Sequence, residues 1–318
     1  LKQITRMAEL LQIKLPWRRF FKIFVVVALF GWLLNYANVT FLEVFQNLTL
    51  ASPAIIFVSL FFFLIHIVLV YFAWHRSLTL FHIDVAARES ISFFAFSTLT
   101  KYLPGGIWHA GSRVYMLGNR GHSKISAFYS VLYESVLSIT ITAALVSLLY
   151  AAIDREMFSL PYISLPGYIY FCIGVVLLLS LCIPTAYRFV FRRYASRLES
   201  DLPNFTIKAL SELLLLYILS FFVFVLGYYF CFKAYLLGQF VLTTEFSFVV
   251  LAATLSGFLV IFSPAGLGVR ESMLYVLAAQ FLDDPLLITI CLAPRFILLL
   301  SEVLFFCLVK FFATNRSV

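Results

Sequence analysis

Apolar residues fill long stretches of this sequence, and polar residues are confined mostly to the connections between them. A helix of about 20 apolar residues is long enough to cross the hydrocarbon core of a bilayer, which is about 30 Å thick. The pattern predicts six such helices, at residues 20–37, 53–75, 124–150, 166–187, 208–236 and 285–310. We therefore expect an all-α polytopic membrane protein.

Two further apolar regions, 89–117 and 245–282, are interrupted by proline and glycine. The interruptions read KYLPGGIWHAGSRVYM at residues 101–116 and FSPAGLGVRESMLY at residues 262–275. Proline lacks a backbone N–H and glycine tolerates unusual dihedral angles, so both segments should break a helix. Arms of about 15 residues reach only about 22 Å, which suits a re-entrant hairpin better than two crossings. For the second region, two short full crossings remain an alternative.

Charged residues indicate the orientation of the chain. Basic residues gather before the first helix and in every second connection after it, whereas the opposite connections carry Glu43, Asp154, Glu156, Glu245, Asp283 and Asp284. The positive-inside rule then places both termini in the cytoplasm and fits a multi-pass protein of the plasma (inner) membrane. Residues 1–19 are predicted to be a cytoplasmic basic juxtamembrane segment rather than a signal peptide, and residues 20–318 a single transmembrane domain.

The predicted elements repeat once, in the order helix, helix, hairpin, helix. The first copy covers about 20–150 and the second about 166–310, starting from the opposite side of the membrane. This arrangement is an inverted-topology repeat, in which paired broken helices mark a binding site near the midplane. The fold prediction is therefore six full transmembrane helices plus two re-entrant broken-helix hairpins.

Composition excludes a soluble domain, since 63% of the residues are hydrophobic, 12% are charged and the mean hydropathy is +1.01. In such a chain, the net charge of +8 reports topology and attraction to anionic lipid rather than to nucleic acid. The five cysteines lie in apolar runs without the spacing of metal ligands or of a disulfide framework. We expect no metal and no cofactor.

The two interruptions are candidates for a substrate site. Non-helical backbone at membrane depth is tolerated where it is buried in protein or lines a water-filled cavity. A helix that restarts there presents free N–H groups, and a nearby guanidinium can bind phosphate in a bidentate fork. The predicted substrate-binding residues are Lys101, Pro104, Gly105, Gly106, His109, Arg113, Pro264, Gly266, Gly268 and Arg270. The alternative is that proline and glycine merely kink ordinary helices while the arginines reach an interface.

Four more ionisable residues interrupt apolar segments, and each is costly if it faces lipid. They are predicted to gate or neutralise the site: Glu134, Glu271, Arg295 and Glu302. Arg295 and Glu302 are two helical turns apart and should share a face. Glu134 and Arg295 follow their prolines at matching distances, so we expect them to pair across the pseudo-twofold axis. A purely structural ion pair is the alternative.

No catalytic motif of a serine hydrolase, zinc peptidase, phosphate-loop NTPase or dinucleotide enzyme occurs. A lipid-linked glycosyltransferase should carry acidic metal ligands in an early outer loop, where residues 38–52 offer only Glu43. We therefore do not predict an enzyme.

The run LPGGIWHAGSRVYMLGNRGHSKISAFYSVLYES, and SPAGLGVRES followed by Arg295, resemble the two signatures of the lysylphosphatidylglycerol synthase transmembrane-region (flippase-domain) family. The resemblance covers roughly residues 20–310 and implies a stand-alone member without the synthase domain. Where the family often has Gly-Asp, and an arginine after the next acidic residue, this chain has Trp108-His109 and Ser135. The Tyr-Leu-Pro-Gly-Gly variant is similar to members associated with cell-surface polysaccharide or glycolipid assembly.

The resemblance implies movement of lipids. The expected function is a flippase or secondary transporter for an anionic phospholipid or a polyprenyl-phosphate-linked glycolipid, with membrane lipids as partners. A homodimer, or a complex with a lipid-modifying or glycan-assembly enzyme, is a further expected partner. The alternatives are a membrane-embedded lipid-linked glycosyltransferase and a non-catalytic partner of such an assembly enzyme.

Overall fold

A computed structural model of the chain describes residues 46–102, 107–153, 167–181, 205–236, 241–260, 263–280 and 286–314. The described residues are almost entirely helical, and no strand occurs among them. Within them, four helices are long and apolar enough to cross a membrane. The prediction of an all-α membrane protein is confirmed at this level.

The four long helices match four of the six predicted spans. They are α4 (Pro53–Leu80), α7 (Lys124–Ala152), α10 (Ile207–Leu236) and α13 (Leu287–Thr314). The predicted span at 166–187 is represented by α8 (Gly167–Leu181), which packs against α7, and its remainder lies outside the described residues. The span predicted at 20–37 and the basic segment 1–19 lie outside them as well.

Two pairs of short helices occupy the predicted interrupted regions. The first pair is α5 (Ala87–Thr100) and α6 (Trp108–Asn119), and the second is α11 (Thr244–Leu259) and α12 (Val269–Ala278). The helices of each pair contact one another. The chain is therefore interrupted where proline and glycine predict it, although Pro104, Gly105 and Gly106 themselves lie outside the described residues.

The second interruption is a short 3-10 turn, η2 (Pro264–Gly266), with left-handed backbone around it. Ala265, Gly266 and Gly268 have φ angles of 52°, 70° and 83°. A Cβ added to Gly266 would lie 2.8 Å from the Cα of Gly257 in α11, too close for any side chain. Glycine at 266 thus meets two requirements, a positive φ and a close approach to α11.

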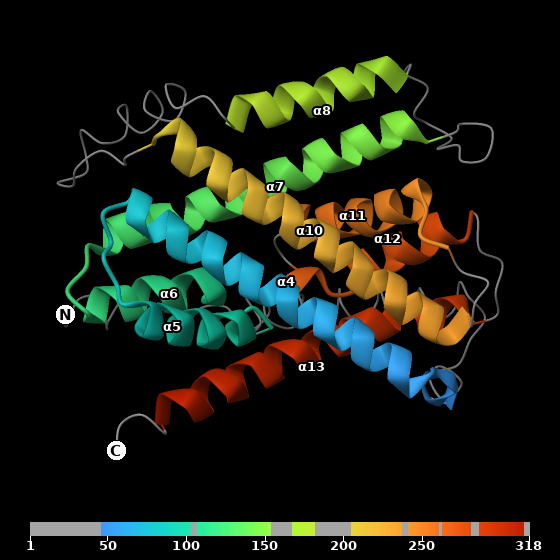
Figure 1. Ribbon diagram of the computed structural model, residues 1–318, viewed down its shortest axis with the longest axis horizontal. Helices are drawn as coiled ribbons and strands as arrows, with labels where there is room; N and C mark the ends of the chain where they lie inside the picture. The colour runs from blue at the N-terminus through green and yellow to red at the C-terminus, as the bar shows by residue number, and fades with distance from the viewer. Residues whose placement is uncertain are drawn as a thin grey trace, which may run out of the picture.

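Helices α4 and α10 form an antiparallel pair through the centre of the molecule (Figure 1). Ser59 Oγ donates to the carbonyl oxygen of Gly227 at 2.7 Å, near the start of α4 and the end of α10. At the opposite end of the pair, Arg76 Nε donates to Glu212 Oε2, also at 2.7 Å. Residue numbers along α10 decrease as those of their partners on α4 increase, so the two helices run antiparallel.

The helix contacts are reciprocal between the two halves of the chain. Helix α5 contacts α13, the last helix of the second half, and α11 contacts α7, the last helix of the first half. Exchanging α4 with α10, α5 with α11, α6 with α12 and α7 with α13 gives back the same set of close contacts among these eight helices. Figure 1 places the pair α5 and α6 at one end of the long axis and the pair α11 and α12 toward the other.

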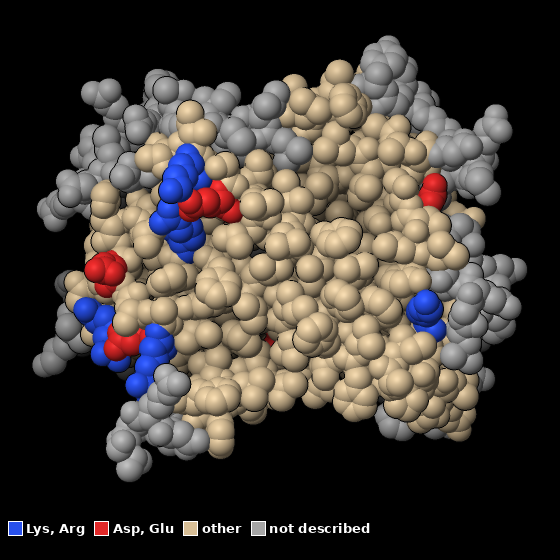
Figure 2. All heavy atoms as spheres, in the orientation of Figure 1, with Lys and Arg blue, Asp and Glu red and all other residues tan. Residues whose placement is uncertain are grey.

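Charge is unevenly distributed on the surface. On the face drawn in Figure 2, lysine, arginine, aspartate and glutamate lie toward the two ends, and other residues cover the middle. Large apolar side chains are exposed along the long helices, among them Phe57, Phe61, Leu215, Phe222 and Leu300. A central apolar band of this kind is what a bilayer covers in a helical membrane protein.

Candidate anion-binding site

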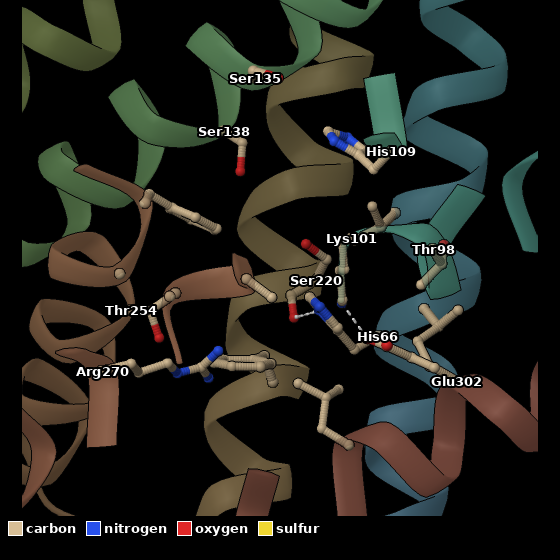
Figure 3. A pocket seen from close by; sticks show the side chains of 18 of the residues that line it. His66, Thr98, Lys101, His109, Ser135, Ser138, Ser220, Thr254, Arg270 and Glu302 are labelled. Atoms are coloured by element: carbon tan, nitrogen blue, oxygen red, sulfur yellow. Dashed lines mark hydrogen bonds and ion pairs between the residues drawn. The ribbon is translucent and has the colours of Figure 1, made fainter. Parts of the chain in front are cut away.

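A cavity of about 500 Å³ lies between the two halves, among α4, α5, α6, α7, α10, α11, α12 and α13 (Figure 3). It is the central cavity of the molecule, and most of the residues predicted for a site line it. These are Lys101, His109, Arg113, Glu134, Gly266, Arg270, Arg295 and Glu302. Residues spread over about 200 positions of sequence thus converge, because an ionisable group on a membrane helix is far cheaper inside the bundle than in lipid.

Three further predicted residues, Pro264, Gly268 and Glu271, lie at the second interruption and at the start of α12. Pro264 opens η2, and Gly268 precedes α12. The backbone N–H of Gly268 donates to Glu271 Oε2 at 2.7 Å, so the carboxylate caps the helix that carries it.

Arg113 on α6 contacts three neighbouring helices. Its Nη1 pairs with Glu134 on α7, and its Nε donates to Ser97 Oγ on α5 at 2.8 Å. The guanidinium carbon lies 4.7 Å from the ring centre of Trp74 and 4.9 Å from that of Phe94. With only 3% of Arg113 exposed, these contacts fix α6 against α4, α5 and α7.

A second ion pair joins α12 to α13. Arg295 Nε lies 3.6 Å from Glu271 Oε1, and Arg295 Nη2 donates to the carbonyl oxygen of Ala265 at 2.7 Å. The expected pairing of Glu134 with Arg295 is therefore wrong, because each pairs within its own half. The charges of the two ion pairs are exchanged between the halves. In the first half an arginine on α6 pairs with a glutamate on α7, and in the second half a glutamate on α12 pairs with an arginine on α13.

The third ion pair crosses between the halves. Lys101, just after α5, pairs with Glu302 on α13. Figure 3 shows this pair at one side of the cavity. As predicted from their spacing, Arg295 and Glu302 both face the cavity from α13. The tight packing of α5 on α13 therefore carries an electrostatic link as well.

Arg270 differs from the other buried charges. Its guanidinium carbon lies 4.8 Å from the ring centre of Phe224 and 5.1 Å from that of Tyr228, both on α10, and only 7% of Arg270 is exposed. Its Nε and Nη2 are buried without a hydrogen-bond partner, and no carboxylate of the described residues forms an ion pair with it. Figure 3 shows the side chain extending from α12 toward the cavity.

The described charges around the cavity do not balance. Among the described residues, four cations (Lys101, Arg113, Arg270 and Arg295) line the cavity, and three of them form ion pairs with the carboxylates Glu134, Glu271 and Glu302. Arg270 is left without such a partner in this part of the chain. A buried ion without a counter-charge costs several kcal/mol even after relaxation. The site therefore favours an anion beside Arg270.

Several hydroxyl groups that were not predicted from the sequence also line the cavity: Thr98, Ser135, Ser138, Ser220, Thr254 and Ser263. Ser135 Oγ and Thr254 Oγ1 donate to carbonyls of their own helices, which leaves their oxygen lone pairs able to accept a hydrogen bond. The signal in the sequence is weak, because Ser and Thr are common in apolar helices and satisfy themselves there. His66 also lines the cavity, and its Nδ1 donates to the carbonyl oxygen of Ser220 at 3.0 Å.

In the part of the chain that the structure describes, no three His, Cys, Asp or Glu side chains lie close enough to hold a metal ion. Comparison of the sequence with protein-family models and with curated proteins found no match. The resemblance to the lysylphosphatidylglycerol synthase transmembrane-region family thus stays a prediction.

Proposed function

We propose that this protein is a lipid flippase or secondary transporter that moves an anionic phospholipid or a polyprenyl-phosphate-linked glycolipid between leaflets. The observation that carries the proposal is the buried Arg270 guanidinium with two unpartnered nitrogens beside a cavity of about 500 Å³. A phosphate is the anion that this group fits best, because the planar guanidinium binds two phosphate oxygens in parallel.

Arg270 rather than Arg113 is the proposed phosphate anchor. The Arg113 guanidinium already contacts Glu134 and Ser97, whereas Nε and Nη2 of Arg270 have no hydrogen-bond partner among the described residues. The hydroxyls of Ser220 and Thr254 and the ring of His109 line the same cavity and supply further polar contacts for a head group. Because Arg113 is paired with Glu134 and Ser97, its proposed role is structural: it positions α6.

The proposed membrane frame is the inverted repeat of six spans and two re-entrant hairpins. The reciprocal contacts between halves support the repeat, as does the antiparallel course of α4 and α10. Helix α12 has 10 residues, or about 15 Å, which is half of a hydrocarbon core and favours a hairpin over a full crossing at 245–282. The ends of α4 and α5 that carry Arg76 and Arg88 would then face the cytoplasm of a plasma (inner) membrane, with both termini on that side.

Alternating access follows from this frame. The two halves contact each other through the central pair α4 and α10, and also through α5 on α13 and α11 on α7. Rocking one half against the other would expose the cavity to each leaflet in turn. The Lys101–Glu302 ion pair spans one of these contacts and would have to break when that side opens.

A leaflet-specific assay tests the proposal. The purified protein is reconstituted into vesicles that contain phosphatidylglycerol with a fluorophore on one chain, close to the head group. A membrane-impermeant quencher reports the fraction of this lipid that changes leaflet. We expect the wild-type chain to accelerate exchange, Arg270→Gln to abolish most of the gain, and Arg76→Gln, at an exposed surface pair, to keep it. Equal exchange in protein-free vesicles would rule out transport of this lipid class. Transfer of sugar to a lipid by the purified protein would favour the transferase alternative.

A further inference from the structure

The lining of the central cavity holds another buried polar group without a partner besides Arg270. Tyr217 on α10 lines the cavity, and only 2% of this residue is exposed. Its hydroxyl has no hydrogen-bond partner among the described residues. Buried hydroxyl groups in proteins are normally hydrogen-bonded, so Tyr217 favours a polar ligand in the cavity as Arg270 does.

Tyr217 and Arg270 lie at different levels of the cavity. The Arg270 guanidinium contacts the rings of both Phe224 and Tyr228, so it lies on the side of Phe224 that is farther from Tyr217. Tyr217 precedes Phe224 by two turns of α10, or about 10 Å along the helix axis. Side chains on a helix lean in the same direction, toward its N-terminus, so this separation is kept. A phosphate held by Arg270 therefore leaves the Tyr217 hydroxyl for another part of the ligand.

His66 on α4 lies at the level between these two groups. Its Nδ1 is 3.0 Å from the carbonyl oxygen of Ser220, one turn after Tyr217, and its ring centre is 4.8 Å from that of Phe224. Figure 3 draws His66 and Ser220 between Arg270 and the opposite side of the cavity. A carbonyl oxygen only accepts, so Nδ1 carries the proton and Nε2 of the neutral ring is an acceptor. We call Arg270, His66 and Tyr217 the polar row.

The polar row suits hydroxyl groups that follow a phosphate. The Tyr217 hydroxyl donates and accepts, and Nε2 of His66 accepts, so a ligand hydroxyl, which also does both, can bind to either. A second anionic group has no proton to donate to Nε2. An ammonium group has one, but four described cations line the cavity, and the carboxylates in its described lining, Glu134 and Glu302, are already in ion pairs.

We propose that the polar row binds the hydroxyl groups of a polyol or sugar attached to the lipid phosphate, and that His66 and Tyr217 select this head group. The inference rests on the proposed function and narrows its substrate to lipids with a hydroxyl-rich head group. The phosphate lies at Arg270, and the head group extends along α10 toward Tyr217. Phe221 also lines the cavity, with its ring stacked on that of Tyr217 at 6.4 Å between centres. Apolar rings with a few placed polar groups are typical of ligand pockets.

Matched short-chain lipids test the selection. Dioctanoyl phosphatidylinositol, phosphatidylglycerol and phosphatidylmethanol share a phosphodiester with one negative charge, and only the first two carry head-group hydroxyls. Binding to the full chain in a neutral detergent is measured by isothermal titration calorimetry. We expect phosphatidylinositol to bind about tenfold more tightly than phosphatidylmethanol, because it adds hydrogen bonds to His66 and Tyr217.

The phosphatidylglycerol arm distinguishes the two kinds of head group. An affinity near that of phosphatidylinositol would identify a glycerol-type chain as sufficient, and one near that of phosphatidylmethanol would identify a ring such as a sugar. Equal affinities for all three lipids would overturn the selection by hydroxyl groups.

Tyr217→Phe removes only the hydroxyl. It should lower the affinity for phosphatidylinositol about fivefold, the effect of one hydrogen bond, and leave that for phosphatidylmethanol unchanged. Thermal unfolding of the lipid-free variant should be unchanged or shifted to higher temperature, because the hydroxyl has no partner to lose among the described residues. Tyr115→Phe, at a residue that is 65% exposed, is the control and should change neither. Unaltered phosphatidylinositol binding in Tyr217→Phe would remove Tyr217 from the site.

Two substitutions of His66 isolate its Nε2 atom. Asparagine places its amide near the position of Nδ1 and can still donate to the carbonyl oxygen of Ser220, whereas glutamine places its amide near the position of Nε2. We expect His66→Asn to lose most of the preference for phosphatidylinositol over phosphatidylmethanol and His66→Gln to keep part of it. The same preference in both variants would argue against Nε2 as the selecting atom.

The selection and the transport fail separately. Arg270→Gln should weaken the binding of all three lipids alike, because each carries the phosphate. A preference for phosphatidylinositol in a chain that moves no lipid between leaflets would overturn the proposed function and leave a binding site for hydroxyl-rich lipids. Leaflet exchange of phosphatidylglycerol without any preference in binding would overturn the polar row and leave the flippase. No binding of any of the three lipids would overturn the polar row together with the phosphate site at Arg270.

Discussion

Arg113 and Arg270 lie on the second helices of the two short pairs, and both guanidinium groups stack on aromatic rings, yet of the two only Arg113 has a carboxylate partner among the described residues. Arg113 therefore belongs to a structural network, whereas Arg270 carries a charge that no described carboxylate pairs with. This difference separates the effects expected from substituting the two residues.

Substitution of Arg113 should destabilise the protein. Arg113→Gln leaves Glu134 buried without its counter-ion, and breaking a buried pair on one side costs about 3–5 kcal/mol. Removing both charges in Arg113→Gln/Glu134→Gln should restore part of the loss. Thermal unfolding in detergent measures both, with Arg120→Gln as the control, since its pair with Glu89 is exposed and is worth less than about 1 kcal/mol. A double variant less stable than either single variant would contradict this account.

Substitution of Arg270, in contrast, should not lower the stability of the protein. Arg270→Met removes a lone buried charge and keeps apolar volume beside Phe224, so unfolding in a neutral detergent should be unchanged or shifted to higher temperature. The wild-type chain should gain stability from added short-chain phosphatidylglycerol, by about 2.7 kcal/mol at 100 times its dissociation constant, and the variant should not. A lipid-induced shift that survives in Arg270→Met would place the phosphate elsewhere.

The second break should tolerate no side chain at 266. Gly266→Ala combines a positive φ with a Cβ that would lie 2.8 Å from Gly257, and we expect a loss of about 1–3 kcal/mol. Gly111→Ala on α6 is the control, because its Cβ meets nothing within 4 Å. Alanine there should stabilise the helix by about 0.5–1 kcal/mol. Thermal unfolding of the two variants should therefore move in opposite directions, and equal shifts would argue against the close packing of η2 on α11.

Much of this architecture could be predicted from the sequence, because the bilayer imposes simple rules. The apolar runs fix α4, α7, α10 and α13 to within a few residues, and proline with glycine marks where the short pairs are broken. Ionisable residues in apolar segments avoid lipid, so Arg113, Arg270 and Glu302 could be expected to meet in one interior cavity.

The partners of those charges could not be predicted in the same way. Matching positions in the two halves suggested that Glu134 meets Arg295, but helix packing brings each to the short helix of its own half. Lys101 and Glu302 are 201 positions apart, and only the contact of α5 with α13 unites them. Pair identity depends on helix rotation and depth, which hydropathy does not report.

The Lys101–Glu302 pair should control how firmly the halves are held together. Because 29% of the Lys101 side chain is exposed, it can rehydrate when Glu302→Gln removes its partner, so the loss of stability should stay near 1–3 kcal/mol. Spin labels on α5 and α13 should report a broader distance distribution in the variant, together with a changed rate of leaflet exchange. The double variant Arg76→Gln/Glu212→Gln is the matched control, since this pair also joins the halves but is about 40% exposed at Arg76 and should contribute little. A distance distribution identical in all three proteins would remove the pair from any part in opening, and would assign the contact of α5 with α13 to apolar packing alone.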